Sequence, residues 1–589
     1  SDSSILFSSF DGPAFRVERG EDGSWGEPKQ VTPASSVLRF ADFAPHSSQK
    51  GVTLAVVEDH TEDKPSTVVN TLGVISSDSN GPTLHTVASG ADFYASPRWS
   101  PSGQFLTWVQ WNHPDMRHRT HHRPWEGSEL WVAKVARDSS GSLNLSQLVE
   151  PGSAVKVAGA LRNVESVSQP RWALPSEDGT APDKLVFLSD RTGFYELYVF
   201  EPEGDKEVKL LLKEPTGADV GGPDWVLGQS THGPLSPTHW VSIASGGALR
   251  VISLADGTSH TVATPYVSIP TLCVVSPTQV AVQGSPATKP SLISLLDLPT
   301  SRSGDPSKEA AKEEILKVSS SASVDPAFIS EGHKISYPTP DGATAYAILY
   351  PPASGSHEGP AGEAPPLVTR CHGGPTSAAR RGLDWMVAFF TSRGFAFADV
   401  DYGGSSAGYG KDFRERLAGQ WGVVDVNDTI ACVEHLVKEG KVDKEKVAIT
   451  GGSAGGFTVL AALTDSKVFT AGCSSYGISD LALLADDTHK FESNYLFKLL
   501  GGTPSEVPQN YHAAQITAPL LLLQGSEDRV VPPAQAQVML DRVRGNGGVA
   551  EMIIFEGEGH GFRQKENRKR AMETELDWYR KTWGIQEEA

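Results

Sequence analysis

Cysteine is scarce in this chain, with four among 589 residues, and their positions lack the spacing of a metal site or a disulfide framework. Three of them, Cys371, Cys432 and Cys473, fall in apolar segments where packing in a core is the expected role. Such usage is typical of a reducing compartment. We therefore expect a cytoplasmic protein without a bound metal or organic cofactor.

Long hydrophobic runs and an excess of positive charge are also missing. No basic segment followed by a long apolar run is present, which predicts neither a secretory signal nor a membrane span. The formal net charge of -20 argues against nucleic acids or anionic membrane surfaces as partners. With 39% hydrophobic and 21% charged residues, the composition is that of an ordinary globular protein able to bury large cores.

The N-terminal half is rich in short strands separated by Gly, Pro and Ser, and a weak repeat recurs roughly every 45 to 60 residues. Two clear copies open with Ser96-Pro97-Arg98-Trp99 and Gln169-Pro170-Arg171-Trp172, and later units begin near Gly222-Pro223-Asp224-Trp225 and Ile269-Pro270-Thr271-Leu272. Each unit contains about four strands, the size of a propeller blade. A pair of β-sandwiches is the alternative.

This pattern predicts a β-propeller of about seven blades over residues 1–325. An incomplete first blade is compatible with the prediction, since the sequence starts with only a fragment of a unit. Residues 301–324 are polar and Ser-rich and are expected to form a surface connector, with a helix-prone stretch at 309–314. The remainder, residues 326–589, has a different texture of buried strands alternating with helices. That texture predicts an α/β domain.

The strongest motif lies in this second domain, at Gly451-Gly452-Ser453-Ala454-Gly455-Gly456. It has the form G-x-S-x-G, with a strand-like run before it at 447–450 and a helix-like run after it at 457–463. A serine on such a strand-to-helix turn is exposed for nucleophilic attack. The alternative is a glycine-rich turn whose serine only caps the helix.

Two further candidates follow Ser453 in chain order. Asp528 comes after the apolar strand 519–525, and His560 lies between glycines after the strand 552–555. The order Ser, Asp, His is that of the α/β-hydrolases, in which the histidine takes the serine proton and the carboxylate orients the imidazole. A solvated loop acid and a surface histidine are the alternatives. Glu527 is the rival carboxylate, but Asp528 begins the Asp-x-x-Val-Pro pattern of the hydrolases.

An oxyanion hole is expected from a second glycine turn. The predicted strand 367–371 ends at His372-Gly373-Gly374-Pro375, where glycine lets a backbone N–H approach a substrate oxygen. The N–H of Ala454, next to the nucleophile, would be the second donor. A plain turn is the alternative.

Together these segments resemble the catalytic domain of the prolyl oligopeptidase family of serine peptidases, and most closely its acylaminoacyl peptidase branch. The resemblance covers residues 330–584 and also rests on the segments 401–410, 420–426 and 558–562. It implies the triad Ser453, Asp528 and His560, and an oxyanion hole formed by the N–H groups of Ala454 and Gly374. Dipeptidyl peptidase relatives use a tyrosine hydroxyl where this chain has His372.

Residues that grip the substrate are harder to place. The resemblance points to Tyr476, Phe491, Glu492 and Tyr495 as the pocket for the residue before the scissile bond, although packing of the core explains the same aromatics. Relatives often carry an arginine where this chain has Gly403, and an Arg or Asn two residues after the triad aspartate. Here that second position is Val530, and Arg529 stands one residue early.

One loop of the first domain, residues 113–123, is dense in His and Arg. The spacing of His118, His121 and His122 invites a metal site, but no Cys or well-placed acid completes one, so a solvated basic loop is expected. If it faces the active site, it would attract a substrate carboxylate.

The sequence thus predicts a serine peptidase that hydrolyses short peptides or N-acylated amino-acid or peptide substrates through an acyl-enzyme on Ser453. A small-metabolite esterase, lactonase or amidase using the same triad is the first alternative, and a non-catalytic propeller scaffold is the second. The expected partner is a small peptide or an acylated small molecule. A homo-oligomer is an open option.

Overall fold

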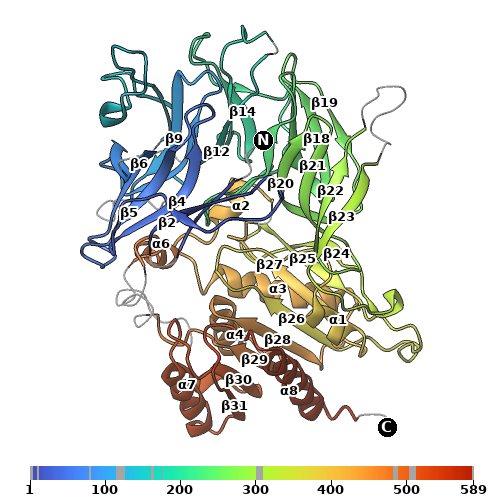
Figure 1. Ribbon diagram of the computed structural model, residues 1–589. Coiled ribbons are helices and arrows are strands. Elements are labelled where there is room, and N and C mark those ends of the chain that lie inside the picture. Colours follow the sequence, from blue (N-terminus) through green and yellow to red (C-terminus); the bar gives the residue numbers. More distant parts are fainter. Residues whose placement is uncertain are drawn as a thin grey trace.

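The chain forms a propeller of β-sheets that sits on an α/β domain (Figure 1). The computed structural model describes residues 4–9, 12–78, 81–113, 126–160, 165–176, 178–299, 310–406, 408–481, 489–502 and 513–586. In Figure 1 the N-terminal half, coloured blue to green, makes the propeller, and the yellow to red half makes the second domain.

Six antiparallel sheets make up the blades. Blade 1 has β1 (Ser4–Ser8), β2 (Ala14–Glu18) and β3 (Lys29–Gln30); blade 2 has β4 (Leu38–Pro45), β5 (Val52–Asp59), β6 (Val69–Asp78) and β7 (Gly81–Ala88); blade 3 has β8 (Phe93–Trp99), β9 (Phe105–Trp111), β10 (Glu129–Lys134) and β11 (Val155–Gly159). Blade 4 has β12 (Val167–Trp172), β13 (Leu185–Ser189), β14 (Glu196–Phe200) and β15 (Lys209–Leu210); blade 5 has β16 (His232–Pro234), β17 (His239–Ala244), β18 (Ala248–Ser253) and β19 (Ser259–Val262); blade 6 has β20 (Ser268–Ser276), β21 (Gln279–Ser285), β22 (Leu292–Asp297) and β23 (Lys312–Val318). The predicted fold class is confirmed, with six blades in place of about seven, and the first blade has three described strands against four in the others.

The repeated sequence unit marks a kink at the start of blades 2, 3 and 4. Each of their first strands has a β-bulge, and in each bulge one non-glycine residue has a positive φ: Asp42 at 51°, Ser96 at 53° and Gln169 at 51°. Side chains join the kinks to the next blade. The N–H of Ser96 donates to Asp42 Oδ2 at 2.6 Å, and the N–H of Thr231 donates to Gln169 Oε1 at 2.9 Å.

Two local predictions in the propeller are wrong. Within the helix-prone stretch 309–314 the structure has the beginning of β23, because pairing with β22 completes the sixth blade and overrides helix propensity. The segment Gly222-Pro223-Asp224-Trp225 does not open a blade. It lies in the loop between β15 and β16, since blade 5 begins only at His232.

The second domain is an eight-stranded sheet in the order β24-β25-β27-β26-β28-β29-β30-β31, antiparallel over its first three strands and parallel from β27 to β31. Its strands are β24 (His333–Pro338), β25 (Thr344–Tyr350), β26 (Leu367–Cys371), β27 (Ala396–Asp401), β28 (Val447–Gly452), β29 (Ala471–Ser475), β30 (Leu520–Gly525) and β31 (Ala550–Phe555). Its helices are α1 (Trp385–Thr391), α2 (Lys411–Glu415), α3 (Val424–Lys438), α4 (Ala454–Asp465), α6 (Tyr495–Leu500), α7 (Pro533–Gly545) and α8 (Lys565–Trp583). Short 3-10 turns occur at Leu145–Gln147, Ser245–Gly247, Pro326–Phe328 and Ala513–Gln515.

Helices cover both faces of this sheet, as parallel strands require. One face packs on α3, α4 and α7, and the other on α1 and α8. Alternate residues of a strand therefore enter different cores: Leu367 joins the first and Val368 the second. No helix in the described ranges is long and apolar enough to cross a bilayer. The predicted domain boundary at residue 325 falls between β23 and β24 and stays a prediction.

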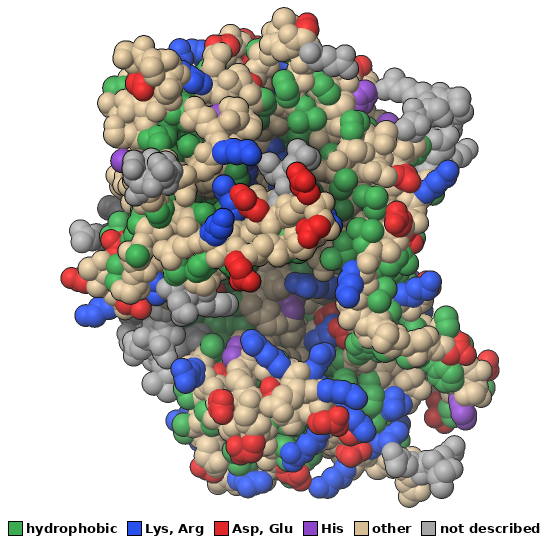
Figure 2. All heavy atoms as spheres, viewed as in Figure 1, with side chains coloured by type: hydrophobic (Ala, Val, Ile, Leu, Met, Phe, Trp, Pro, Cys, Tyr) green, Lys and Arg blue, Asp and Glu red, His purple; other side chains and the backbone are tan. Residues whose placement is uncertain are grey.

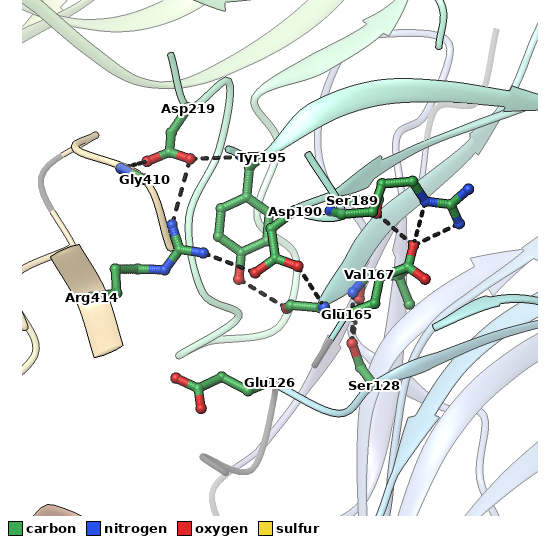
Figure 3. A network of polar contacts seen from close by, with 12 residues as sticks. Glu126, Ser128, Glu165, Val167, Ser189, Asp190, Tyr195, Asp219, Gly410 and Arg414 are labelled. Atoms are coloured by element: carbon green, nitrogen blue, oxygen red, sulfur yellow. Dashed lines mark hydrogen bonds and ion pairs between the residues drawn. The ribbon is translucent and has the colours of Figure 1, made fainter. Parts of the chain in front are cut away.

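Buried ion pairs join the two domains. Arg414 of α2 reaches into blade 4, where its guanidinium lies 2.9 Å from Asp190 and 3.5 Å from Asp219 and covers the ring of Tyr195 at 4.5 Å (Figure 3). The N–H of Gly410 also donates to Asp219, at 3.1 Å. Burial raises the pKa of Asp190 to about 6 even beside this cation. A buried contact of this kind fixes the orientation of the partners that make it.

A second buried ion pair crosses the interface close to α6. Lys498 of that helix bonds to Glu126 of the propeller, and both side chains are almost wholly buried. Figure 2 shows that one face of the molecule is hollowed where the propeller meets the second domain. Two sets of buried charged contacts thus join the two domains.

Candidate active site

Ser453 occupies the sharp turn that the motif predicts, between β28 and α4. Its backbone has φ 57° and ψ -122°, a strained conformation for a residue with a side chain. Its N–H is held by the carbonyl of Ser475 at 3.0 Å, and its own carbonyl accepts the N–H of Phe457 at 3.1 Å. Strain and anchoring on both sides place the hydroxyl at the end of the sheet.

The glycines after Ser453 are needed because other backbone comes very close. A Cβ on Gly455 would lie 2.2 Å from the carbonyl oxygen of Cys371, and a Cβ on Gly456 would lie 2.6 Å from the Cα of Gly477. The first contact brings the end of β26 against the start of α4. The turn that follows β26 is therefore held beside Ser453, where a Cβ on Gly373 would lie 3.5 Å from the Ser453 Cβ.

His560 joins Ser453 to Asp528. Its Nε2 lies 2.9 Å from Ser453 Oγ, and its Nδ1 lies 2.9 Å from Asp528 Oδ2. Because a carboxylate only accepts hydrogen bonds, Nδ1 carries the proton and Nε2 is the acceptor for the serine hydroxyl. The structure thus brings together the three residues that the sequence predicts, although they are separated by up to 107 positions.

Asp528 is held more firmly than a solvated loop acid would be. Its side chain is fully buried, and its Oδ1 accepts the N–H groups of Val530 at 2.9 Å and Val531 at 2.8 Å. The rival Glu527 is exposed and makes no described contact with His560. The geometry therefore favours Asp528, as the sequence pattern does.

Sequence reasoning missed the side chain that holds the His560 loop. Glu558 is buried, and its carboxylate accepts the N–H groups of Arg563 and Gln564 and the amide of Asn567, each at 2.9 Å. Its carbonyl accepts the N–H of Glu527 at 2.9 Å, which ties the loop to the one that carries Asp528. The available signal was an acid two residues before the histidine, in the loop that leads to α8.

His372 supports the turn that contains Gly373 and Gly374. Its Nε2 lies 2.7 Å from Ser405 Oγ, which donates to the carbonyl of Tyr402, so the imidazole donates to the serine hydroxyl. Its Nδ1 is then free to accept from the Tyr402 hydroxyl at 3.2 Å, and the two rings stack at 4.3 Å. Burial lowers the pKa of His372 to about 4, so the ring is neutral near neutral pH.

The predicted oxyanion donors lie on this turn and at the helix start. Ala454 is the first residue of α4, and the first N–H groups of a helix have no intrahelical acceptor. Gly374 has φ 58°, and its carbonyl accepts the N–H of Ser377 at 2.7 Å. The hydrogen bond closes the turn beside Ser453, while the assignment of the two N–H groups to an oxyanion hole stays a prediction.

The predicted substrate residues fall into different places. Tyr476 lies at the end of β29, with its ring 5.1 Å from that of His560. Phe491 and Tyr495 contact aromatic side chains of the propeller, Glu492 is half-buried, and Arg529 is exposed. Tyr476 is thus the one that touches the Ser-His-Asp group. The binding roles of all five stay predictions.

Trp225, a propeller residue, was missed as part of this region. Its ring lies 5.2 Å from Tyr495, edge to face, and 6.2 Å from Phe491. The Tyr495 hydroxyl lies 2.6 Å from Thr376 Oγ1, two residues beyond Gly374. The propeller therefore reaches the glycine turn through two aromatic side chains. The signal was the repeat-like Gly222-Pro223-Asp224-Trp225, which occurs without a strand.

A cavity of about 540 Å³ lies elsewhere on the interface. It is lined by Asn70, Asp92 and His113 of the propeller and by Lys490 and Ser493 of the second domain, among others, and by no member of the Ser453 group. In the basic loop 113–123 only His113 lies within the described residues. The metal and carboxylate hypotheses for that loop therefore lie outside the described part of the chain.

Comparison with known proteins places this arrangement in a family. Residues 381–586 match the model of the prolyl oligopeptidase family. The dipeptidyl aminopeptidase BIII of Pseudoxanthomonas mexicana is 30% identical over 237 residues, which cover 38% of this chain and 34% of that protein. The acylamino-acid-releasing enzyme of Arabidopsis thaliana is 27% identical over 228 residues, covering 36% of this chain and 29% of that protein. The matched segment thus spans about a third of these curated relatives.

Solved structures match over the whole chain. A puromycin-hydrolyzing peptidase of Mycobacterium tuberculosis is 32% identical with a TM-score of 0.83, over 99% of this chain and 85% of that one. A second crystal structure, of a puromycin hydrolase, is 33% identical with a TM-score of 0.82 over the same shares. Since the likeness extends through both domains and the sequence match covers the strands and loops around Ser453, the chain belongs to the prolyl oligopeptidase family.

Proposed function

We propose that this protein is a serine peptidase that hydrolyses short peptides or N-acylated amino-acid or peptide substrates. The observation that carries the proposal is the position of His560, within 2.9 Å of both Ser453 Oγ and Asp528 Oδ2. A hydroxyl, an imidazole of defined tautomer and a buried carboxylate in this order are the groups that acyl transfer needs. The family membership points to the same chemistry.

The reaction begins with attack of Ser453 Oγ on the substrate carbonyl while His560 Nε2 takes the hydroxyl proton. Asp528 stabilises the imidazolium that forms, because its buried carboxylate already accepts the Nδ1–H. The protonated His560 then gives its proton to the leaving amine, which leaves an ester on Ser453. A water molecule, deprotonated by His560, hydrolyses this acyl-enzyme and restores the serine.

Negative charge on the substrate oxygen needs donors that are already in place. We assign this role to the N–H groups of Ala454 and Gly374, the first at the positive end of α4 and the second on the turn pinned by His372. A neutral His372 adds no charge of its own near the site. Removing one such donor typically costs about 100-fold to 1,000-fold in turnover.

A fluorophosphonate probe and a substrate panel test the proposal. The probe should label the wild-type protein and not a Ser453→Ala variant, and absence of labelling would favour the scaffold alternative. The panel should contain aminoacyl and N-acylaminoacyl anilides, short peptides, simple esters and puromycin, which gives the structural relatives their names. Hydrolysis confined to esters or lactones would favour the esterase alternative. A homo-oligomer and a cytoplasmic location stay predictions, tested by the molar mass in solution and by cell fractionation.

A further inference from the structure

A four-residue turn carries Gly374, and one side of it is held by the loop after β27. The N–H of Ser377 donates to the carbonyl of Gly374 at 2.7 Å, which makes Thr376 the third residue of the turn. Ser406 donates to the turn twice, from its hydroxyl to the carbonyl of Thr376 at 2.7 Å and from its N–H to the carbonyl of Ser377 at 2.8 Å. The backbone carbonyls on this side of the turn are therefore fixed.

The side chain of Thr376 anchors the turn to a different element. Its Oγ1 lies 2.6 Å from the hydroxyl of Tyr495, the first residue of α6, which is a short distance for a bond between two hydroxyls. Thr376 is fully buried, and Tyr495 is 7% exposed. Because water has almost no access, removal of either hydroxyl would leave the other without this bond.

The propeller sets the position of the Tyr495 ring. Trp225 packs against it edge to face, with the ring centres 5.2 Å apart and the planes at 89°. One turn further along α6, Lys498 bonds to Glu126 of the propeller. Residues three positions apart lie on the same side of a helix, so α6 meets the propeller along one side that includes Tyr495. The Tyr495 hydroxyl is therefore aligned by a contact between the domains.

The turn needs such support because its own backbone is permissive. Gly373 and Gly374 lack side chains, and Gly374 has φ 58°. The same turn lies beside the nucleophile, since a Cβ on Gly373 would be 3.5 Å from the Ser453 Cβ. Donors to a developing oxyanion act best when they are in place beforehand, and a displacement of about 1 Å can cost about 100-fold in rate. Contacts that fix Thr376 therefore bear on the rate of the reaction.

We propose that Tyr495 is a positioning residue for the oxyanion hole. Its hydroxyl fixes Thr376 and, through the turn, holds the N–H of Gly374 in place, while Trp225 orients its ring. The inference rests on the proposed reaction at Ser453. It differs from the arrangement of dipeptidyl peptidase relatives, in which a tyrosine hydroxyl serves the hole directly. Tyr495 acts on the chemical step through Thr376, without contact with the reacting atoms.

Removal of one oxygen tests this role. Tyr495→Phe keeps the ring and its contact with Trp225 but deletes the bond to Thr376. Its kcat for the best anilide of the substrate panel should fall by about 10-fold to 100-fold with KM nearly unchanged, because the loss is confined to the transition state. Tyr266→Phe is the matched control, since it removes a buried bond to the Ser294 hydroxyl within the propeller and should keep the wild-type kcat. A loss confined to KM would overturn the proposal in favour of a substrate pocket.

Variants of Thr376 separate the bond from general packing. Thr376→Ser retains a hydroxyl and should keep most of the activity, whereas Thr376→Val removes it at similar shape and should match Tyr495→Phe. The double variant Tyr495→Phe/Thr376→Val should lose no more than either single one, because all three lack the same bond. Losses that multiply would show that the two side chains act independently, contrary to the proposal.

The rate of fluorophosphonate labelling distinguishes a failure of this inference from a failure of the proposed function. The probe reacts with the nucleophile of any active serine hydrolase, and its phosphoryl oxygen needs the same donors as the oxyanion. Labelling should be about tenfold slower in Tyr495→Phe and about 2-fold to 10-fold slower in Trp225→Leu, the scale of one aromatic pair, at unchanged melting temperatures.

Each outcome of the labelling experiment has one meaning. Equal rates in wild type and Tyr495→Phe would overturn the positioning role. A wild-type rate in Trp225→Leu would overturn the part assigned to the propeller. No labelling of the wild-type protein would instead refute the proposed function at Ser453.

Discussion

The two domains supply the proposed site in different ways. The α/β domain places Ser453, Asp528 and His560 just after the C-terminal ends of three parallel strands, where each backbone is fixed by sheet pairing. The propeller reaches the region through a loop with no regular structure, held by Arg414 and by the aromatic contacts of Trp225. The groups that need accurate geometry follow the ends of paired strands, whereas the propeller contacts near them come from a loop whose place depends on the docking of the two domains.

The sharpest test of this division is the nucleophile itself. Ser453→Ala should lower kcat by on the order of a million-fold, because the attacking oxygen is gone while the fold remains. Steady-state kinetics with an aminoacyl anilide measure the loss, and an unchanged melting temperature shows that the domain is intact. Retention of a tenth of the activity would show that the chemistry lies elsewhere.

The carboxylate gives the next largest effect. Asp528→Asn should reduce kcat by about 10,000-fold, since an amide in this position no longer holds the tautomer of His560 that accepts the serine proton. Glu527→Gln is the matched control, because its side chain is exposed and adjacent in sequence. A crippled Glu527→Gln enzyme beside an active Asp528→Asn enzyme would reverse the assignment.

Domain docking should matter for stability more than for the chemical step. Arg414→Met leaves Asp190 and Asp219 buried without their cation, which should cost about 3–5 kcal/mol of unfolding free energy. The exposed Arg542→Met on α7 is the control for charge. Urea unfolding measures the effect, and equal midpoints for the two variants would mean that the interface does not depend on this ion pair.

A smaller effect concerns the pH dependence of the α/β domain. Glu575 of α8 is buried and accepts the hydroxyl of Tyr579 at 2.7 Å, and burial raises its pKa to about 7 from the ordinary 4.5. The folded state therefore holds a proton that the unfolded state releases between pH 4.5 and 7, so the Glu575 contribution to stability is lost as pH rises through this window. Above pH 7 the penalty is constant.

Glu575→Gln removes this titration. The gain in unfolding free energy of the variant over wild type should be larger at pH 8 than at pH 5, measured by urea unfolding at both. Glu573→Gln, an exposed position on the same helix, should show no such difference. Identical pH profiles for wild type and Glu575→Gln would mean that the carboxyl ionises normally in the fold.

Sequence reasoning was most successful where structure is local. The strand 367–371 and the runs around Ser453 were predicted with almost the observed bounds, because a buried parallel strand is a continuous apolar run and the glycine turns have few alternatives. The chain order of Ser453, Asp528 and His560 could be recognised from the sequence for the same reason. Ser453, Asp528 and His560 lie one, three and five positions after the ends of their own strands.

Prediction failed where long-range contacts decide the structure. The stretch that begins β23 has the composition of a helix, and only pairing with β22 makes it a strand. Gly222-Pro223-Asp224-Trp225 resembles the opening of a blade, but the loop it occupies is placed by Arg414 and Tyr495, about 190 and 270 positions away along the chain. The number of blades likewise depends on the contacts that close the propeller. A sequence repeat of variable length does not specify that number.

We expect blades 2 and 4 of this propeller to complete their folding only when the blade that follows each of them is present. The strained backbone of Asp42 is offset by the hydrogen bond from Ser96, and that of Gln169 by the bond from Thr231. Without the following blade, blade 2 or blade 4 therefore keeps the strained backbone of Asp42 or Gln169, and the side-chain oxygen of that residue has no N–H group from the next blade to accept. We expect the blades to become stable in the order of their synthesis. An N-terminal fragment that ends after blade 2 or blade 4 should therefore stay protease-sensitive until the following blade is added.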